Sequence, residues 1–251
     1  MSLLILIFIL CLGFTTSFLG VTAGGAGILR TSILVLLGVP HAAAVASSRI
    51  GVLTSSVAAI RQFHRARKIE YRVAFFTVLS TTCGSAIGAV CLNSLPDGIS
   101  RKLLAFASLV FVATGAIQRP KEANISTIHL NARHSLGYGL FAFVGFWANF
   151  AGAGGAMIGN SLLVRYFGKT FLEAAATRQL ATLFSALTGF PIFLAKGLVN
   201  PELAVVLAFG MTGGSFAGTS FALHRGDHWV KAAILIVAVV SGVGLLLLPA
   251  S

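Results

Sequence analysis

Long apolar runs constrain this chain more than any other feature of its sequence. They cover approximately residues 3–20, 27–38, 42–60, 71–93, 103–118, 136–150, 155–167, 171–195, 201–223 and 230–249. Only 10% of the residues are charged, against roughly 25% in soluble domains, and the mean hydropathy is +0.93. A helix needs about 20 apolar residues to cross a bilayer, so the sequence predicts an all-α integral membrane protein with roughly eight to ten segments.

The first run, residues 3–20, is interpreted as a segment of the mature protein. No Lys or Arg precedes it, and the chain continues into glycines and a second apolar run. A cleaved signal peptide would need a basic start and a small-residue cleavage site. We therefore expect this segment to remain in the membrane.

The ten runs form two matching sets of five. A glycine, a serine and a hydroxyl–arginine pair recur at a spacing of 129 positions. The aligned residues are Gly25 and Gly154, Ser32 and Ser161, and Ser48-Arg49 and Thr177-Arg178. Such internal symmetry is typical of transporters. We expect two homologous membrane repeats, 1–118 and 136–251, joined by a linker at 119–135.

The second run of each set, 27–38 and 155–167, has only about a dozen residues, which is short for a crossing at 1.5 Å per residue. Glycine-rich stretches precede both, at Gly24-Gly25-Ala26-Gly27 and at Gly152-Ala153-Gly154-Gly155. Each short run is expected to form a re-entrant hairpin or a broken helix with the run before it. The sequence leaves hairpin and full crossing open.

Small residues recur four positions apart in the fourth run of each set, at Gly84 and Gly88 and at Gly214 and Gly218. Such faces let helix backbones approach closely in lipid, where dispersion drives packing. We interpret these four glycines as helix-packing positions.

The basic residues predict how the chain is oriented. If the loop 61–72 is cytoplasmic and the second repeat is inverted, twelve Lys and Arg lie inside and three outside; a parallel repeat gives eight against seven. The positive-inside rule favours an inverted repeat with both termini outside and a cytoplasmic linker. The net charge of +12 is therefore not a sign of nucleic-acid binding.

No catalytic or metal-binding pattern stands out. All six acidic residues fall in loops or at segment ends, so a buried proton or sodium relay has no obvious residue. Paired carboxylates, zinc motifs, phosphate loops and nucleophile elbows are absent from the sequence, and the three cysteines have no metal-type spacing. We expect neither an enzyme nor a cofactor.

Two arginines lie inside apolar runs at equivalent positions, Arg49 and Arg178. An arginine near hydrocarbon costs at least a few kcal/mol, so it normally faces a wet cavity or a partner. One interpretation is that both guanidiniums flank a cavity and bind an anion through forked hydrogen bonds. The alternative is that each extends to the membrane interface or caps a neighbouring helix.

Unwound glycines would add backbone N–H groups and positive helix ends to such a site. The candidate substrate-binding residues are Arg49, Arg178, Gly24, Gly25, Gly27, Gly154, Gly155, Ser32, Ser48, Ser161, Asn160 and Thr177. The hydroxyls and the amide alternatively bond back to their own helices. Arg30 has Gly159 as its counterpart and is interpreted first as an interface anchor. Thr182 and Ser185 share a helix face with Arg178 and either line a pathway or pack as buried polar residues.

At these residues the sequence resembles the TauE/SafE sulfite exporter family, also called the 4-toluene sulfonate uptake permease family. The resemblance covers nearly the whole chain. It is carried by the glycine break and short run from Gly24 to Leu37, the helix start at Gly38-Val39-Pro40-His41, the basic loop from Arg65 to Glu70, the run from Gly84 to Gly88, and the repeat of this pattern after Phe141.

The resemblance implies an inner-membrane secondary transporter for small sulfur-containing anions such as sulfite or organosulfonates, often in the export direction. The family commonly has an apolar residue where this chain has Arg49 and Arg178, and Ala153 dilutes the second glycine stretch. The expected partners are a small anion and the lipid bilayer, and pairing with a second copy is left open. An uptake permease, an anion channel and a non-transporting membrane subunit are the alternatives.

Overall fold

The computed structural model describes residues 3–96, 99, 130–152, 154–230 and 232–233, which form helices and no strands. The helices are α1 (Leu3–Ala23), α2 (Gly27–Leu36), α3 (His41–Arg65), α4 (Tyr71–Asn93), α6 (Leu130–Phe150), α7 (Gly155–Phe167), α8 (Phe171–Ala195) and α9 (Pro201–Arg225). The predicted all-α class is confirmed. The expected run 103–118, most of the run 230–249 and the linker up to residue 129 lie outside the described residues.

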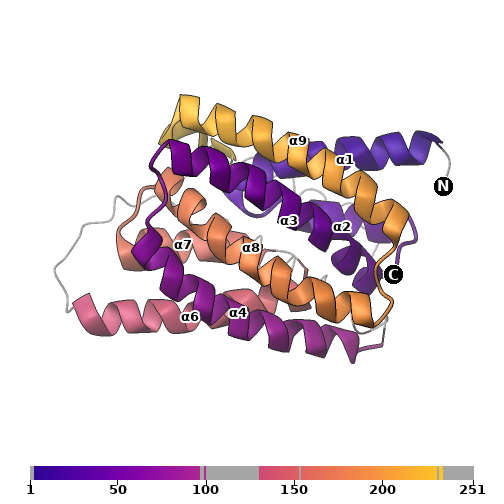
Figure 1. Ribbon diagram of the computed structural model, residues 1–251, viewed down its shortest axis with the longest axis horizontal. Coiled ribbons are helices and arrows are strands. Elements are labelled where there is room, and N and C mark those ends of the chain that lie inside the picture. Colours follow the sequence, from indigo (N-terminus) through magenta and orange to yellow (C-terminus); the bar gives the residue numbers. More distant parts are fainter. Residues whose placement is uncertain (1–2, 97–98, 100–129, 153, 231, 234–251) are drawn as a thin grey trace.

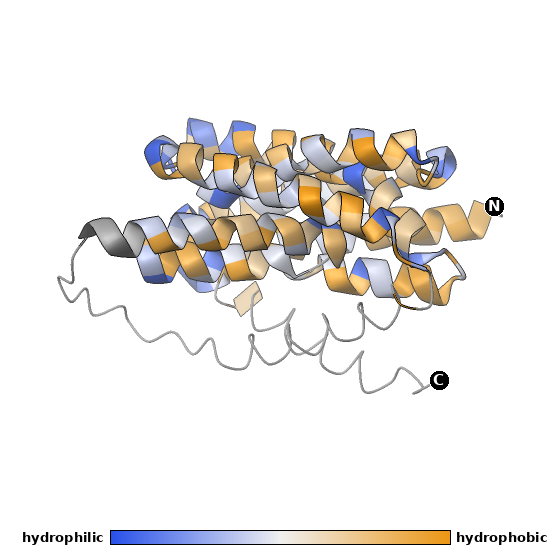
Figure 2. Cartoon of the chain, turned by 90° about the horizontal axis from the view of Figure 1, so that it is seen from below, coloured by the Kyte–Doolittle hydropathy of each residue, from blue (hydrophilic) through white to orange (hydrophobic). Residues whose placement is uncertain are grey.

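Apolar side chains cover the outside of the helix bundle. Among the described helices, α1, α3, α4 and α9 are long and apolar enough to cross a membrane, and α2 is a shorter apolar helix of 10 residues. Large hydrophobic side chains such as Phe75, Leu79, Phe209 and Phe216 are exposed along the lengths of α4 and α9. Figure 2 colours the hydrophobic residues of the helices orange. The chain is therefore a multi-pass membrane protein.

The two sets of helices follow one order of lengths: a long helix, a short helix and two long helices. The lengths are 21, 10, 25 and 23 residues for α1 to α4 and 21, 13, 25 and 25 residues for α6 to α9. α6 begins at Leu130, so the last residues of the expected linker are helical. Helix α1 packs against α9, and α6 packs against α4, so the first helix of each set pairs with the fourth helix of the other (Figure 1).

The four glycines expected at packing positions lie in these two seams. A Cβ on Gly84 or Gly88 would collide with the backbone of α6, at Ala142 and Phe146. A Cβ on Gly214 or Gly218 would collide with the backbone of α1, at Phe14 and Phe18. Their interpretation as close-packing residues is confirmed, although the sequence did not reveal which helices they join.

Helices α3 and α8 lie at the centre of the bundle, and each packs against helices of the other set. Ser47, near the start of α3, accepts a hydrogen bond from the N–H of Asn200, which lies just beyond α8. Farther along α3, Ser56 contacts Gln179 near the start of α8. The corresponding helices α3 and α8 therefore run in opposite directions.

Helix α2 returns the chain toward the side from which α1 came. Residues 10, 14 and 18 of α1 approach residues 210, 214 and 218 of α9, and α3 follows α9 in the same sense through its contacts of Ser55 with Ser215 and of Gln62 with Phe216. Because α1 and α3 both run parallel to α9, the chain reverses between them. Helix α2 rises about 15 Å, half of the roughly 30 Å hydrocarbon core, which fits a re-entrant segment.

Both glycine breaks use backbone conformations that favour glycine. Gly24 ends α1 with φ +83°, and Gly152 and Gly154 follow α6 with φ +74° and +81°. The breaks also lie close together, because a Cβ on Gly24 would come within 2.8 Å of the backbone of Ala156 in the first turn of α7. The two interruptions therefore meet in the middle of the protein.

Candidate functional site

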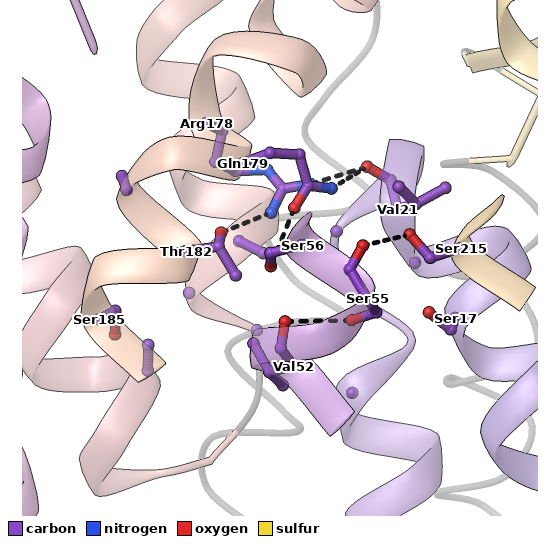
Figure 3. Close-up of a pocket in the computed structure, with 18 of the residues that line it drawn as sticks. Ser17, Val21, Val52, Ser55, Ser56, Arg178, Gln179, Thr182, Ser185 and Ser215 are labelled. Carbon is purple, nitrogen blue, oxygen red and sulfur yellow. Dashed lines mark hydrogen bonds between the residues drawn. The ribbon is translucent and has the colours of Figure 1, made fainter. Parts of the chain in front are cut away.

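A cavity of about 130 Å³ lies where the glycine breaks meet α3 and α8. Residues of both sets line it: Thr16, Ser17, Gly20, Val21, Gly24, Gly27, Arg30, Arg49, Val52, Ser55, Ser56, Thr81, Phe141, Val144, Ala148, Gly152, Gly154, Gly155, Ala156, Arg178, Gln179, Ala181, Thr182, Ser185, Met211 and Ser215. Figure 3 shows hydroxyl and amide groups on its wall, from α1, α3, α8 and α9. One water needs only about 10–15 Å³ of such space, so the cavity has room for a small hydrated ion.

The two short helices begin at this cavity. Gly27 opens α2 and Gly155 opens α7, and both line the cavity. Neither helix start is capped by a side chain. The first N–H groups of a helix have no partner within the helix, and they carry partial positive charge, so both starts favour an anion.

Arg178 is held by three helices. Its Nε donates to Oδ1 of Asn160 at 2.7 Å, one terminal nitrogen donates to Oγ1 of Thr182 at 3.0 Å, and the other donates to the carbonyl of Val21 at 3.0 Å. The side chain is 2% exposed. Gln179 donates to the same Val21 carbonyl (Figure 3). Arg178 thus lines the cavity and also caps the last turn of α1. Both interpretations from the sequence, a cavity residue and a helix cap, therefore apply to it.

Arg49 occupies the equivalent position on α3 but has fewer hydrogen-bond partners than Arg178. One of its terminal nitrogens donates to the carbonyl of Ala148, in the last turn of α6. Its Nε is buried and has no hydrogen-bond partner among the described residues. The side chain is 6% exposed and lines the cavity.

Arg30 also lines the cavity, which corrects its interpretation as an interface anchor. It is 6% exposed, and its Nε lies 3.3 Å from Oγ of Ser48 on α3. The sequence argument discounted Arg30 because Gly159 is its counterpart. The wall of a cavity between two imperfect repeats need not use equivalent residues, so the lack of a counterpart was no reason to discount Arg30.

No acidic residue lines the cavity in the part of the chain that the structure describes. Glu70 pairs with Lys169 at 2.8 Å, Glu173 belongs to the N-terminal capping box of α8, and Asp227 accepts from the N–H of Leu172. The cavity therefore gathers three guanidiniums, and no carboxylate among the described residues lies in its wall. Buried positive charge of this kind is stable only beside a counter-ion, water or helix carbonyls, and the carbonyls of Ala148 and Val21 supply part of this compensation.

Half of the predicted site residues lie in the cavity wall. Arg49, Arg178, Gly24, Gly27, Gly154 and Gly155 line it, whereas Gly25, Ser32, Ser48, Ser161, Asn160 and Thr177 do not. Several of the second group bond to protein groups instead. Asn160 links Arg178 to the Thr22 carbonyl, Ser161 donates to the carbonyl one turn earlier, and Thr177 accepts from the N–H of Glu70.

The sequence argument missed most of the neutral polar wall. It proposed Thr182 and Ser185 as lining or packing residues, and both line the cavity. Ser17, Ser55, Ser56, Gln179 and Ser215 were not proposed. The sequence offered two signals for these residues: Gln179 stands next to Arg178, and Ser55 and Ser56 are adjacent within one apolar run.

The comparisons with known proteins agree with this architecture. Residues 9–245 match the family described as sulfite exporter TauE/SafE. A probable membrane transporter protein of Haemophilus influenzae is 26% identical over 93% of this chain and 91% of its own length. The probable membrane transporter proteins ORF9 of Sinorhizobium sp and YfcA of Escherichia coli K12 are 21% and 23% identical, over 96% and 91% of this chain and 92% and 85% of their own lengths.

No solved structure matches the chain significantly. The family match nevertheless covers most of the sequence, and it coincides with the helices that surround the arginine-lined cavity. The chain therefore belongs to the sulfite exporter TauE/SafE family of membrane transporters.

Proposed function

We propose that the protein is a secondary transporter that exports small sulfur-containing anions, such as sulfite or organosulfonates, through the cavity between its two repeats. The observation that carries the proposal is the arginine-lined cavity itself. Arg30, Arg49 and Arg178 line one cavity, and no carboxylate among the described residues lines it. An oxyanion would balance the positive charge of the guanidiniums and accept hydrogen bonds from their unused N–H groups.

Alternating access follows from an inverted repeat, in which each half presents an equivalent gate. The opposite directions of α3 and α8 support this arrangement. So do two contacts at opposite ends of the bundle (Figure 1): the N–H of Glu70 donates to Oγ1 of Thr177, and the N–H of Asn200 donates to Oγ of Ser47. We propose that these two end contacts open in turn.

The bodies that move need not be the two sequence halves. Helix α1 joins α9 through one glycine seam, and α4 joins α6 through the other. Such seams pair backbones closely and leave little freedom to separate. We propose that α1 and α9 move together as one unit and that α4 and α6 move together as another.

The membrane potential is sufficient to drive export. An inside-negative potential favours outward movement of an anion by about 2.3 kcal/mol per charge per 100 mV. An acid-based cation site is not needed in this scheme. We place the protein in the bacterial inner membrane, as its family resemblance implies, with both termini outside on the strength of the charge distribution in the loops.

Flux in proteoliposomes tests this function. Labelled sulfite and sulfoacetate would be followed under an imposed potential for the wild type and for the double variant Arg49→Ala/Arg178→Ala. The matched control is Arg61→Ala, because Arg61 lies on α3 like Arg49 but is exposed. We expect saturable flux in the wild type and the control, and at least a tenfold loss in the double variant.

Other outcomes separate the alternatives. Inward flux at the same rate without a potential would indicate an uptake permease, and flux that does not saturate would indicate a channel. Flux that is unchanged in the double variant would remove the arginines from the site. The absence of flux for both anions would favour a subunit without transport activity.

A further inference from the structure

We propose that the site selects doubly charged oxyanions and that Arg30 and Arg49 hold the anion, while Arg178 is a fixed positioning residue. This inference rests on the proposed function and deepens it by naming the charge of the substrate and the residues that read it. It departs from the duplicated pair Arg49 and Arg178 that the sequence suggests.

Arg178 has little capacity left for a ligand. Each of its three nitrogens already donates to a protein acceptor, and those acceptors belong to α1, α7 and α8. Its charge also faces the carbonyl end of α1, where the helix dipole favours a cation. Two donors remain of the five that a guanidinium carries, and the three bonds fix where they point.

Arg49 is bound less completely. Only one terminal nitrogen has an acceptor, the carbonyl of Ala148. The buried Nε has none among the described residues, and a buried N–H without a partner carries a free-energy cost. An oxyanion in the cavity would accept from this Nε and from a terminal nitrogen together, in the forked geometry that arginine offers.

Arg30 offers the second fork. Its Nε is turned toward Ser48, whose own hydroxyl donates to the carbonyl of Ala44 at 2.7 Å. Both terminal nitrogens of Arg30 lack an acceptor among the described side chains and backbone groups. They belong to a side chain that lines the same cavity as Arg49, and the two guanidiniums repel each other.

Charge balance then favours a dianion over a monoanion. Two guanidiniums with unused donors share one cavity with the starts of α2 and α7, and no described carboxylate offsets them. A single negative charge leaves one of these guanidiniums uncompensated, whereas two charges neutralise both. Two charges at a given distance interact more strongly in a buried site than in bulk water, so the second charge contributes strongly to affinity.

A matched pair of ligands tests the charge preference. Sulfate and methanesulfonate are both tetrahedral at sulfur, but methanesulfonate has a methyl group in place of one oxygen and carries one charge. Binding to the purified full chain would be followed by thermal stabilisation at fixed ionic strength. We expect sulfate to bind at least tenfold more tightly, and Arg30→Gln and Arg49→Gln each to remove this preference.

Two further variants separate binding from folding. Arg30→Lys keeps the charge but loses the fork, so it should retain the preference for sulfate with weaker binding of both ligands. Asn160→Ala removes one partner of Arg178 from outside the cavity wall, so it should lower the melting temperature without the anion and leave the preference intact. The exposed Arg61→Gln is the control for non-specific loss of charge.

Several results would overturn the inference. They are equal affinities for the two ligands in the wild type, an unchanged preference in Arg30→Gln, or a preference lost in Asn160→Ala alone. Flux in proteoliposomes distinguishes this failure from failure of the proposed function. Saturable flux with no preference for charge would refute the dianion site and keep the transporter, whereas a sulfate preference without flux would refute the transporter and keep the site.

Discussion

Arg49 and Arg178 occupy equivalent positions in the two repeats, yet their surroundings differ. Each donates to a carbonyl two residues before the end of the first helix of the other repeat, Ala148 in α6 and Val21 in α1. Arg178 has two more acceptors, whereas Nε of Arg49 has no partner among the described residues. The duplicated backbone therefore fixes where both guanidiniums lie, and the neighbouring side chains decide whether each is bound to protein or free for a ligand.

Three substitutions between the repeats produce this difference. Asn160 and Thr182, which hold Arg178, correspond to Thr31 and Leu53 at the spacing of 129 positions. Gly159 corresponds to Arg30, and a Cβ there would lie 3.3 Å from Cδ of Arg178. The missing side chain in one repeat leaves room for Arg178, and the same position in the other repeat supplies a third charge.

The largest expected effect is that Arg178→Gln lowers the free energy of unfolding whereas Arg49→Gln does not. Arg178→Gln breaks three interhelical or intrahelical hydrogen bonds and should lower the free energy of unfolding by about 2 kcal/mol without an anion. Arg49→Gln removes a poorly compensated buried charge and should leave stability unchanged or raise it by up to about 1 kcal/mol. Unfolding of both variants in detergent would measure this. Equal losses would mean that the two arginines are equivalent.

The glycine seams are expected to be the symmetric part of the molecule. Gly84→Ala and Gly214→Ala would each place a Cβ against the backbone of the facing helix, at a cost of about 1–3 kcal/mol. Gly213→Ala is the matched control, because its Cβ would meet Phe14 only at ordinary contact distance, 3.6 Å. Thermal unfolding should show similar losses in the two seams and none in the control. A loss in only one seam would break the symmetry.

A transplant sharpens the comparison further. Leu53→Thr gives Arg49 the hydroxyl that Thr182 gives Arg178, one helical turn later. The new partner should stabilise the free protein by about 0.6 kcal/mol and weaken anion binding several-fold, since the ligand then competes for Arg49. Titration of sulfate against the wild type and the variant measures both. Tighter binding in the variant would contradict the view that Arg49 is the free guanidinium.

The smallest expected effect concerns the two end contacts. Ser47→Ala and Thr177→Val each remove one hydrogen bond, so stability should change by only about 0.5–1 kcal/mol. The proposed gates lie at opposite ends, so the two variants should shift access to the cavity in opposite directions. Labelling from each side of proteoliposomes would show this. A shift in the same direction would remove the gate role.

The sequence predicted those features that are local. Apolar runs predicted the helices, the glycines predicted the breaks near Gly24 and Gly154, and the repeat pointed to Arg49 and Arg178 as cavity residues. These features depend on hydrophobic period, composition and backbone conformation, all of which a short stretch of sequence determines.

Long-range pairing was beyond the sequence. Nothing in one chain indicates that Asn160 bonds to Arg178 and to the end of α1, so a ligand contact was weighed only against a bond to its own helix. Arg30 was undervalued because only duplicated residues were weighted. The crossing of α1 to α9 and of α6 to α4 also depends on contacts between residues some 200 and 60 positions apart.

Protection of a cysteine in the cavity is the most direct test of the central claim that an anion binds between the repeats. With Cys11, Cys83 and Cys91 replaced by Ser, the Ser17→Cys variant places a thiol in the cavity wall, and Ser94→Cys places one at the exposed end of α4. Labelling by a small anionic methanethiosulfonate reagent would be timed with and without sulfate. We predict that sulfate slows labelling at position 17 and leaves position 94 unchanged; equal rates at position 17 with and without sulfate would contradict an anion site there.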